Sequence, residues 1–192
     1  MFSAVQVSLE FTPNPNTLKF VVSRPLMARG ACNFTSSSQT KNKSPLAEQL
    51  FEVAGVVSVL LGTNFVTITK GPQGDWDLIA EKVPQTIQDF LAQNSSVFAP
   101  GYDPEAATTQ TTLKPEDQEI ERKIRELLDT EIRPAVAMDG GDITFGKYED
   151  GIVYLSLQGA CSSCPSSTAT LKMGVETRLK EVIPQIREVV QY

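Results

Sequence analysis

The residues with the clearest chemical potential are two cysteines, Cys161 and Cys164, which are separated by two serines. They lie just before a stretch with apolar residues at helical spacing, so we expect them in a loop that enters a helix. The free N–H groups at the start of a helix favour a thiolate over a thiol, and thiolates bind metals and attack disulfides. The motif therefore predicts metal ligation or thiol chemistry.

The rest of the composition narrows that chemistry. The chain has 192 residues, three cysteines and no histidine, so Ser-His-Asp hydrolysis, Cys-His proteolysis and histidine-ligated zinc are excluded for a single chain. The third cysteine, Cys32, lies in the polar segment 29–44, which we predict to be a mobile loop. We interpret its thiol as incidental to function. An odd number of cysteines without secretory features indicates reduced thiols in a reducing compartment.

Three functional uses of the cysteine pair remain open, beside a purely structural pair of buried thiols. In thiol-disulfide exchange Cys161 would attack and Cys164 would resolve, but a thioredoxin-like frame would need a parallel strand-helix-strand unit around the motif. A zinc site usually needs four ligands, and two copies of the motif across a two-fold axis supply four thiolates. The same four thiolates are the ligand set of a 4Fe-4S cluster, which is the use that we favour.

The elements that must position the cysteines come from the second half of the chain. An amphipathic helix is expected from about residue 115 to 133, and Pro134 should kink or restart it. Alternating apolar residues on either side of 149–151 predict a hairpin. The helix after the cysteines should break at Pro184, and residues 186–192 predict a last short strand against the hairpin.

Glycines and aspartates stand on both sides of the hairpin. We interpret Gly140, Gly141 and Gly159 as backbone devices for tight turns, since glycine adopts positive φ without steric cost. Asp139 and Asp142 are interpreted as solvated turn formers, because acidic residues beside glycines favour turns. General acid-base catalysis by this pair is not expected.

The first half of the chain predicts a second, separate set of elements. Period-two alternation indicates strands at 5–11 and 18–22, and another pair at 56–61 and 65–70 around a compact Gly-Thr-Asn loop. Apolar residues at helical spacing indicate two helices. The first helix starts at Pro45 and stops before Gly55, and the second starts after Asp75 and contains Pro84.

A Pro-, Thr- and Ser-rich stretch without periodicity separates the two halves. We therefore divide the chain into an N-terminal domain, 1–93, a linker, 94–116, and a C-terminal domain that carries the cysteine pair, 117–192. Strands and helices that are not strictly alternating favour an α+β fold, with two small domains that are each a mostly antiparallel sheet packed with helices.

The charge and hydropathy of the chain exclude several partners. Seventeen Lys and Arg residues against 23 Asp and Glu residues give a net charge of −6, which is opposite to what nucleic-acid binding requires. No run of apolar residues is long enough for a membrane helix. The N-terminus leads directly into an alternating strand pattern, so we expect a cytoplasmic protein.

Two longer motifs carry a family resemblance. The run 138–142, the hairpin and the run from Gly159 to Thr168 resemble the C-terminal domain of NifU and the Nfu-type iron-sulfur proteins. The run 11–20 and the hairpin 56–70 resemble the Nfu N-terminal domain. The two resemblances together cover the whole chain in the family's usual order.

The resemblance implies a function. It implies a non-catalytic scaffold or carrier that receives a nascent iron-sulfur cluster from upstream assembly factors and delivers it to apo-proteins. Cys161 and Cys164 of two protomers would bind a 4Fe-4S cluster, with 2Fe-2S as a second possible cargo, so a homodimer is expected in the loaded state. The N-terminal domain would take part in client or partner recognition.

Overall fold

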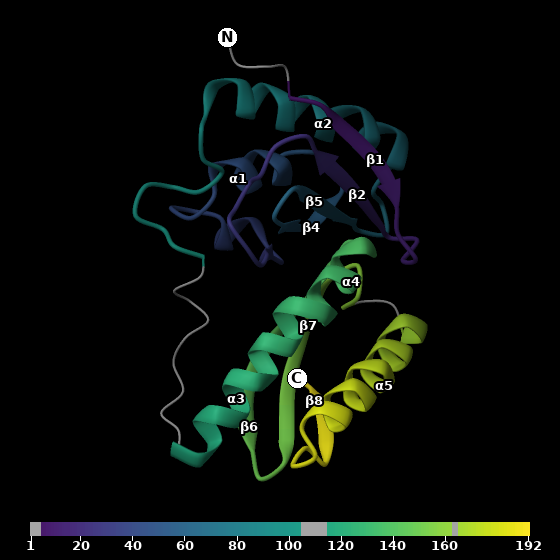
Figure 1. Cartoon of the computed structure of the whole chain (residues 1–192). Helices are drawn as coiled ribbons and strands as arrows, with labels where there is room; N and C mark the ends of the chain where they lie inside the picture. Colours follow the sequence, from purple (N-terminus) through teal and green to yellow (C-terminus); the bar gives the residue numbers. More distant parts are fainter. Residues whose placement is uncertain (1–4, 105–114, 163–164) are drawn as a thin grey trace.

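The computed structural model describes residues 5–104, 115–162 and 165–192, and these form two β-sheets with separate hydrophobic cores (Figure 1). The strands of the first sheet are β1 (Val7–Phe11), β2 (Thr17–Val22), β3 (Cys32–Phe34), β4 (Val56–Leu61) and β5 (Phe65–Lys70). The strands of the second are β6 (Gly141–Glu149), β7 (Ile152–Gly159) and β8 (Glu188–Gln191). The predicted α+β class, with sheets packed against helices, is confirmed.

The first sheet has the order β1-β2-β5-β4-β3, and all of its pairings are antiparallel. Helices α1 (Pro45–Phe51) and α2 (Trp76–Gln93) cover the face of this sheet that points away from the second half of the chain (Figure 1). Their apolar residues and every second strand residue form one core. That core includes Leu18, Phe20, Val22, Val59, Leu61, Val66, Ile68, Leu46, Leu50, Ile79, Val83 and Ile87.

Both helices begin where the sequence predicts, because each has a side-chain cap. The Ser44 hydroxyl accepts a hydrogen bond from the Ala47 N–H at 3.2 Å, and an Asp75 carboxylate oxygen accepts one from the Asp77 N–H at 2.9 Å. These bonds satisfy N–H groups that have no partner inside the helix. Pro84 lies inside α2 and does not end it.

The prediction of a mobile loop at 29–44 is wrong for part of that segment. Cys32–Phe34 form the edge strand β3, which pairs with Leu61, Leu60 and Val59 of β4. Ser37–Gln39 form a short 3₁₀ turn, and Phe34 is buried in the first core. The segment is too short and too polar to show strand alternation, so only its pairing with β4 reveals it.

The described part of the segment 94–116 follows the first core closely. Val97 is buried in that core, and its carbonyl oxygen accepts a hydrogen bond from the Ser44 hydroxyl at 2.7 Å. The Ala99 N–H donates to the Lys43 carbonyl at 2.8 Å. Residues 105–114 of this segment lie outside the described part of the chain.

The second half builds a three-stranded sheet with helices on one side. α3 (Pro115–Leu127) runs into a π-helical turn at Leu128–Ile132 and then into α4 (Arg133–Met138), and α5 (Pro165–Val182) joins β7 to β8. The kink predicted at Pro134 is thus a π-helical turn. A proline has no N–H to donate to the preceding turn, which favours such an irregularity.

The strand pairings of the second sheet combine two directions. β6 and β7 form the predicted antiparallel hairpin, whose turn contains Asp150 at φ 48° and Gly151 at φ 82°. β8 lies parallel to β7, with Val189 opposite Val153. The longer of the two pairings is antiparallel, as expected, and β8 adds a parallel strand at the edge. Leu171, Val175 and Leu179 of α5 pack on or in the core above it.

Glu121 on α3 predicts a pH effect on stability. Burial raises the pKa of its carboxyl group, although Arg125 lies 3.5 Å away. A raised pKa means that folding favours the protonated form, so stability is lost as the pH rises above the ordinary pKa of about 4.5 and through the raised pKa of the folded state. We expect Glu121→Gln to raise the free energy of unfolding slightly at pH 7, and to change it little below pH 4.5. Urea unfolding at both pH values measures this difference, and a loss of stability at pH 7 would contradict it.

Candidate cluster-binding site

Two turns at the same end of the second sheet form the site. Asp139–Gly140 lead into β6, and Gly159–Ala160 follow β7. They lie side by side because Gly141 is paired with Gly159 across the hairpin, and the Ala160 N–H donates to the Gly140 carbonyl at 3.2 Å. The hairpin therefore brings the glycine turn to the loop that contains Cys161.

The prediction that glycines serve as turn devices is confirmed at two positions. Gly140 has φ 76° and Gly159 has φ 64°, which are conformations that side chains disfavour. A Cβ at position 159 would also lie 2.6 Å from Cδ2 of Leu60 and 2.7 Å from the Gly140 carbonyl oxygen. Position 159 thus requires glycine for its backbone angle and for close packing.

A pair of glycine substitutions separates these two requirements. Gly159→Ala is expected to lower the free energy of unfolding by about 2–3 kcal/mol, because the strain of positive φ and the crowding each cost about 1 kcal/mol or more and add. Gly101 is the matched control, since it has φ 82° and no atom within 4 Å of a built Cβ. Gly101→Ala should cost about 1 kcal/mol or less. Thermal unfolding of both variants measures the difference, and equal shifts would show that crowding at position 159 is unimportant.

Cys161 is buried at the edge of the second core, with 4% of its surface exposed. Its sulfur packs against the backbone of Gly141, where a Cβ would lie 2.5 Å from Sγ. Gly141 thus serves to admit the thiol, and its φ is not positive. Cys164 lies outside the described residues, so its expected role as the second ligand stays a prediction. α5 starts directly after this loop.

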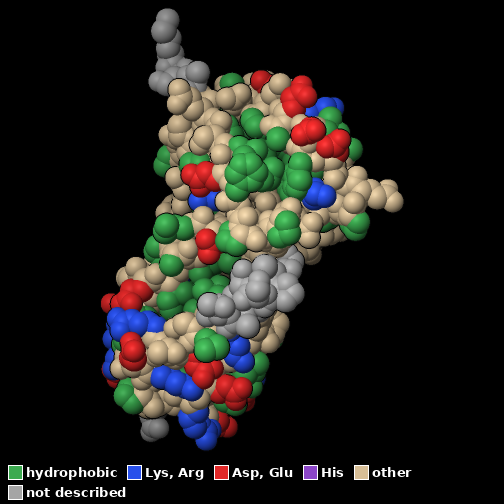
Figure 2. All heavy atoms as spheres, turned by 90° about the vertical axis from the view of Figure 1, so that its right-hand side faces the viewer, with side chains coloured by type: hydrophobic (Ala, Val, Ile, Leu, Met, Phe, Trp, Pro, Cys, Tyr) green, Lys and Arg blue, Asp and Glu red, His purple; other side chains and the backbone are tan. Residues whose placement is uncertain are grey.

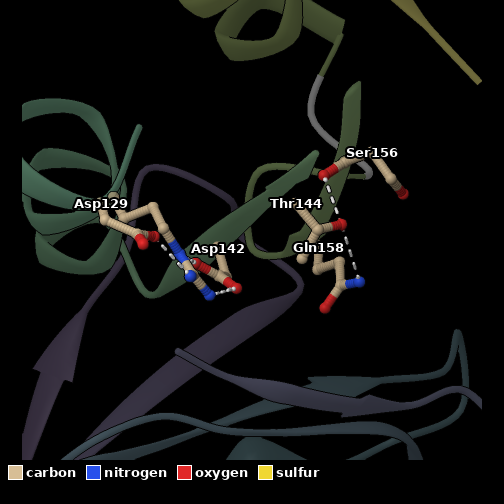
Figure 3. A network of polar contacts seen from close by, with 6 residues as sticks. Asp129, Asp142, Thr144, Ser156 and Gln158 are labelled. Atoms are coloured by element: carbon tan, nitrogen blue, oxygen red, sulfur yellow. Dashed lines mark hydrogen bonds and ion pairs between the residues drawn. The ribbon is translucent and has the colours of Figure 1, made fainter. Parts of the chain in front are cut away.

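The interpretation of Asp142 as a solvated turn former is wrong. Asp142 is 4% exposed, and its two carboxylate oxygens accept hydrogen bonds from Arg133 Nε and Nη2 at 2.9 and 2.7 Å. Arg133 also donates to Asp129 at 2.9 Å (Figure 3). The two carboxylates outweigh the effect of burial and raise the pKa of the guanidinium. This two-point contact fixes the start of β6 against α4.

Residues from the first half of the chain also reach the site, which the sequence did not predict. The Asn14 side-chain amide is buried and donates to the Ala160 carbonyl oxygen at 3.0 Å. Lys19 Nζ donates to the Met138 carbonyl oxygen at 3.3 Å and pairs with Glu10 at 2.9 Å. The strands predicted at 5–11 and 18–22 imply a connection that contains Asn14, but nothing in the sequence indicates its acceptor at Ala160.

Cys32 does not join the site. Its sulfur lies 3.7 Å from the Tyr102 hydroxyl, and burial raises the pKa of its thiol. The same burial, with the contact to Cys32, raises the pKa of Tyr102 to about 12. In the part of the chain that the structure describes, no three His, Cys, Asp or Glu side chains are placed to hold a metal ion.

Two family models match the chain, one in each half. Residues 7–94 match the N-terminal domain of the scaffold protein Nfu/NifU, and residues 124–190 match the NifU-like domain. A solution NMR structure of a NifU-like protein from Saccharomyces cerevisiae aligns with 50% of this chain and 87% of its own, at 25% identity and a TM-score of 0.45.

Curated relatives match almost the entire chain. A human protein named "NFU1 iron-sulfur cluster scaffold homolog, mitochondrial" is 41% identical over 186 residues, which are 96% of this chain and 71% of the human protein. Its namesake from Drosophila ananassae is 42% identical over 185 residues. The chain spans 63% of that protein's length and 61% of the length of the Drosophila grimshawi relative.

The names of these relatives contradict the expected cytoplasmic location, because they describe mitochondrial proteins. The expectation rested on reduced thiols and on the strand pattern near residue 5. Reduced thiols indicate a reducing compartment, but they do not indicate which reducing compartment it is. Among the described residues, no helix is long and apolar enough to cross a membrane. From the two family models and the near-complete match to the human relative, the chain belongs to the Nfu family of iron-sulfur cluster scaffold proteins.

Proposed function

We propose that this chain is a non-catalytic carrier that binds a 4Fe-4S cluster between two copies and transfers it to apo-proteins, with 2Fe-2S as a second cargo. Cys161 and Cys164 of each copy would be the ligands. The observation that carries the proposal is the place of Cys161, whose sulfur packs on Gly141 in the loop that leads into α5. Upstream assembly factors would supply the cluster, and the relatives' names support a mitochondrial location.

The number of thiolates supports a pair of chains. Iron-sulfur clusters of this type take four cysteine ligands, and the motif offers two. Exposed apolar side chains also lie on the two helices next to the site, since Met138 at the end of α4 is 75% exposed and Met173 on α5 is 71% exposed. Figure 2 shows hydrophobic side chains on the face that carries β1, α4 and α5. Such surfaces are typical of sites that a partner covers.

Transfer would occur by ligand exchange. An incoming thiolate of the apo-protein takes the place of Cys161 or Cys164 on the cluster, and the start of α5 stabilises the thiolate that is released. The division into an N-terminal domain, 1–93, a linker, 94–116, and a cluster-binding domain, 117–192, belongs to this proposal. It accords with the two family models, of which one ends at residue 94 and the other begins at residue 124.

Native mass spectrometry after anaerobic reconstitution with iron and sulfide tests the proposal. We expect a dimer that is heavier by one four-iron, four-sulfide unit. A dimer with two irons and two sulfides would keep the shared site and change the cargo. A monomer without iron that reduces disulfides would instead indicate an oxidoreductase, and a colourless dimer with stoichiometric zinc would indicate a structural zinc site.

A further inference from the structure

The first sheet has a second face, which the helices do not cover. Lys19, Thr67 and Leu60 lie opposite one another on β2, β5 and β4, because Thr67 is paired with both of the others. Their sequence neighbours point into the first core, so these three side chains point to the other face. All three are nevertheless buried, at 9%, 1% and 1% exposed surface. We refer to them as the cap row.

The cap row is buried because the two turns of the site, at Gly140 and Gly159, pack against it. A Cβ at Gly140 would lie 3.0 Å from Thr67 Oγ1 and 3.4 Å from Cβ of Lys19. A Cβ at Gly159 would lie 2.6 Å from Leu60. Two glycines without side chains thus allow the sheet to approach the loop that carries Cys161.

Asn14 adds a directed bond to this contact. Its amide donates to the carbonyl oxygen of Ala160, the residue before Cys161, across 146 positions of sequence. Asn14 Oδ1 accepts from the Asn16 N–H at 3.0 Å, which holds the turn between β1 and β2. The loop is closed on this side, and Ala160 and Cys161 are 3% and 4% exposed.

This closed arrangement conflicts with a shared cluster. Cys161 itself packs in the second core against Gly141, while the first sheet contacts its neighbours Gly140, Gly159 and Ala160. A thiol that is 4% exposed cannot reach iron that is also bound by a second chain, so the loop that carries Cys161 must move, and the first sheet holds the turns beside that loop in place. The cap row and Asn14 belong to a separate sheet with its own core, so they can leave without unfolding either core.

The contact between the cap row and the loop also leaves buried polar atoms without hydrogen bonds. Among the described residues, three side-chain oxygens are buried without a hydrogen-bond partner: Thr67 Oγ1, Gln158 Oε1 and, on α3, Glu121 Oε1. Thr67 belongs to the cap row, and Gln158 on β7 points toward the strands of the first sheet (Figure 3). Buried polar atoms without partners cost free energy, and separation returns them to water. The contact is thus suited to opening.

We propose that the first sheet is a removable cap over the Cys161 loop, held by the cap row and Asn14, and that cluster binding and capping exclude each other. The part of this inference that concerns cluster binding rests on the proposed function. The capped chain protects Cys161 while no cluster is present. Displacement of the cap then exposes the loop to a second copy of the chain.

Two substitutions in the full chain should release the cap. Leu60→Glu places a charge against Gly159, and Asn14→Asp keeps the acceptor for the Asn16 N–H while it sets a carboxylate oxygen against the Ala160 carbonyl. Val57→Glu is the matched control, because Val57 lies on the same strand as Leu60 and is 45% exposed. Circular dichroism verifies that each variant is folded. If Leu60→Glu does not fold, the test of the cap depends on Asn14→Asp alone.

The readout is the rate at which N-ethylmaleimide alkylates Cys161 in the cluster-free chain, resolved from other cysteines by tandem mass spectrometry. We expect this rate to rise about tenfold in both variants, because Leu60→Glu buries a charge against Gly159 and Asn14→Asp replaces a hydrogen bond by repulsion between two oxygens. Val57→Glu should leave it unchanged. Equal rates in all folded chains would overturn the cap.

Reconstitution with iron and sulfide then separates the two proposals. Faster cluster loading by the two uncapped variants supports exclusion between cap and cluster, whereas loading at the unmodified chain's rate overturns it. If no chain binds a cluster, the proposed function is wrong, and the alkylation rates still decide whether the first sheet covers Cys161.

Discussion

Replacement of Cys161 by alanine is expected to abolish cluster binding, with no iron or sulfide retained after reconstitution. One ligand lost from each copy leaves two thiolates for a cluster that takes four. Iron and sulfide analysis and the visible absorbance of the cluster measure the result. Alanine is preferable to serine, because Cys161 lies in the second core and a buried hydroxyl there would cost about 1–3 kcal/mol.

Cys32→Ala is the matched control for that experiment. Cys32 lies in the first half beside Tyr102, and burial raises the pKa of its thiol, which keeps it protonated. The variant should therefore load the full amount of iron and sulfide. Full loading by Cys161→Ala, or an equal loss in both variants, would refute the assignment of Cys161 as a ligand.

The second large effect concerns the contact between Asp142 and Arg133. Asp142→Ala is expected to destabilise the second sheet by about 2–3 kcal/mol, because it leaves a largely buried guanidinium without its two-point partner. Arg133 retains Asp129 and is 22% exposed, which keeps the loss below that of a fully buried pair. Hydrogen exchange of β6 and β7 peptides should accelerate about 30- to 150-fold.

Asp129→Ala probes the same arginine from its exposed side. The Asp129 side chain is 47% exposed, so its ion pair with Arg133 is screened by water, and we expect a cost of about 0–1 kcal/mol. Similar exchange rates in the two variants would show that burial of Asp142 is not what makes its contact strong.

The sequence by itself determined the features that depend on neighbours along the chain. Period-two alternation gives the strands of both hairpins, and Ser44 and Asp75 cap helices through bonds that span two or three residues. Positive φ at Gly140 and Gly159 follows from turns that few other residues tolerate. The two cysteines before a helix, together with the absence of histidine, were sufficient to indicate metal or thiol chemistry.

Only the tertiary structure decided the features that depend on distant partners. Cys32–Phe34 become a strand through pairing with β4, and Asp142 is buried because Arg133 reaches it from α4. The bond from Asn14 to Ala160 joins the two halves of the chain. Such contacts leave no periodic pattern in the sequence. Asn14 and Asp142, for example, are residue types that are equally suited to a solvated turn. Cys161 is buried in the second core against Gly141, and its neighbour Ala160 is bonded to Asn14, which only the tertiary structure reveals.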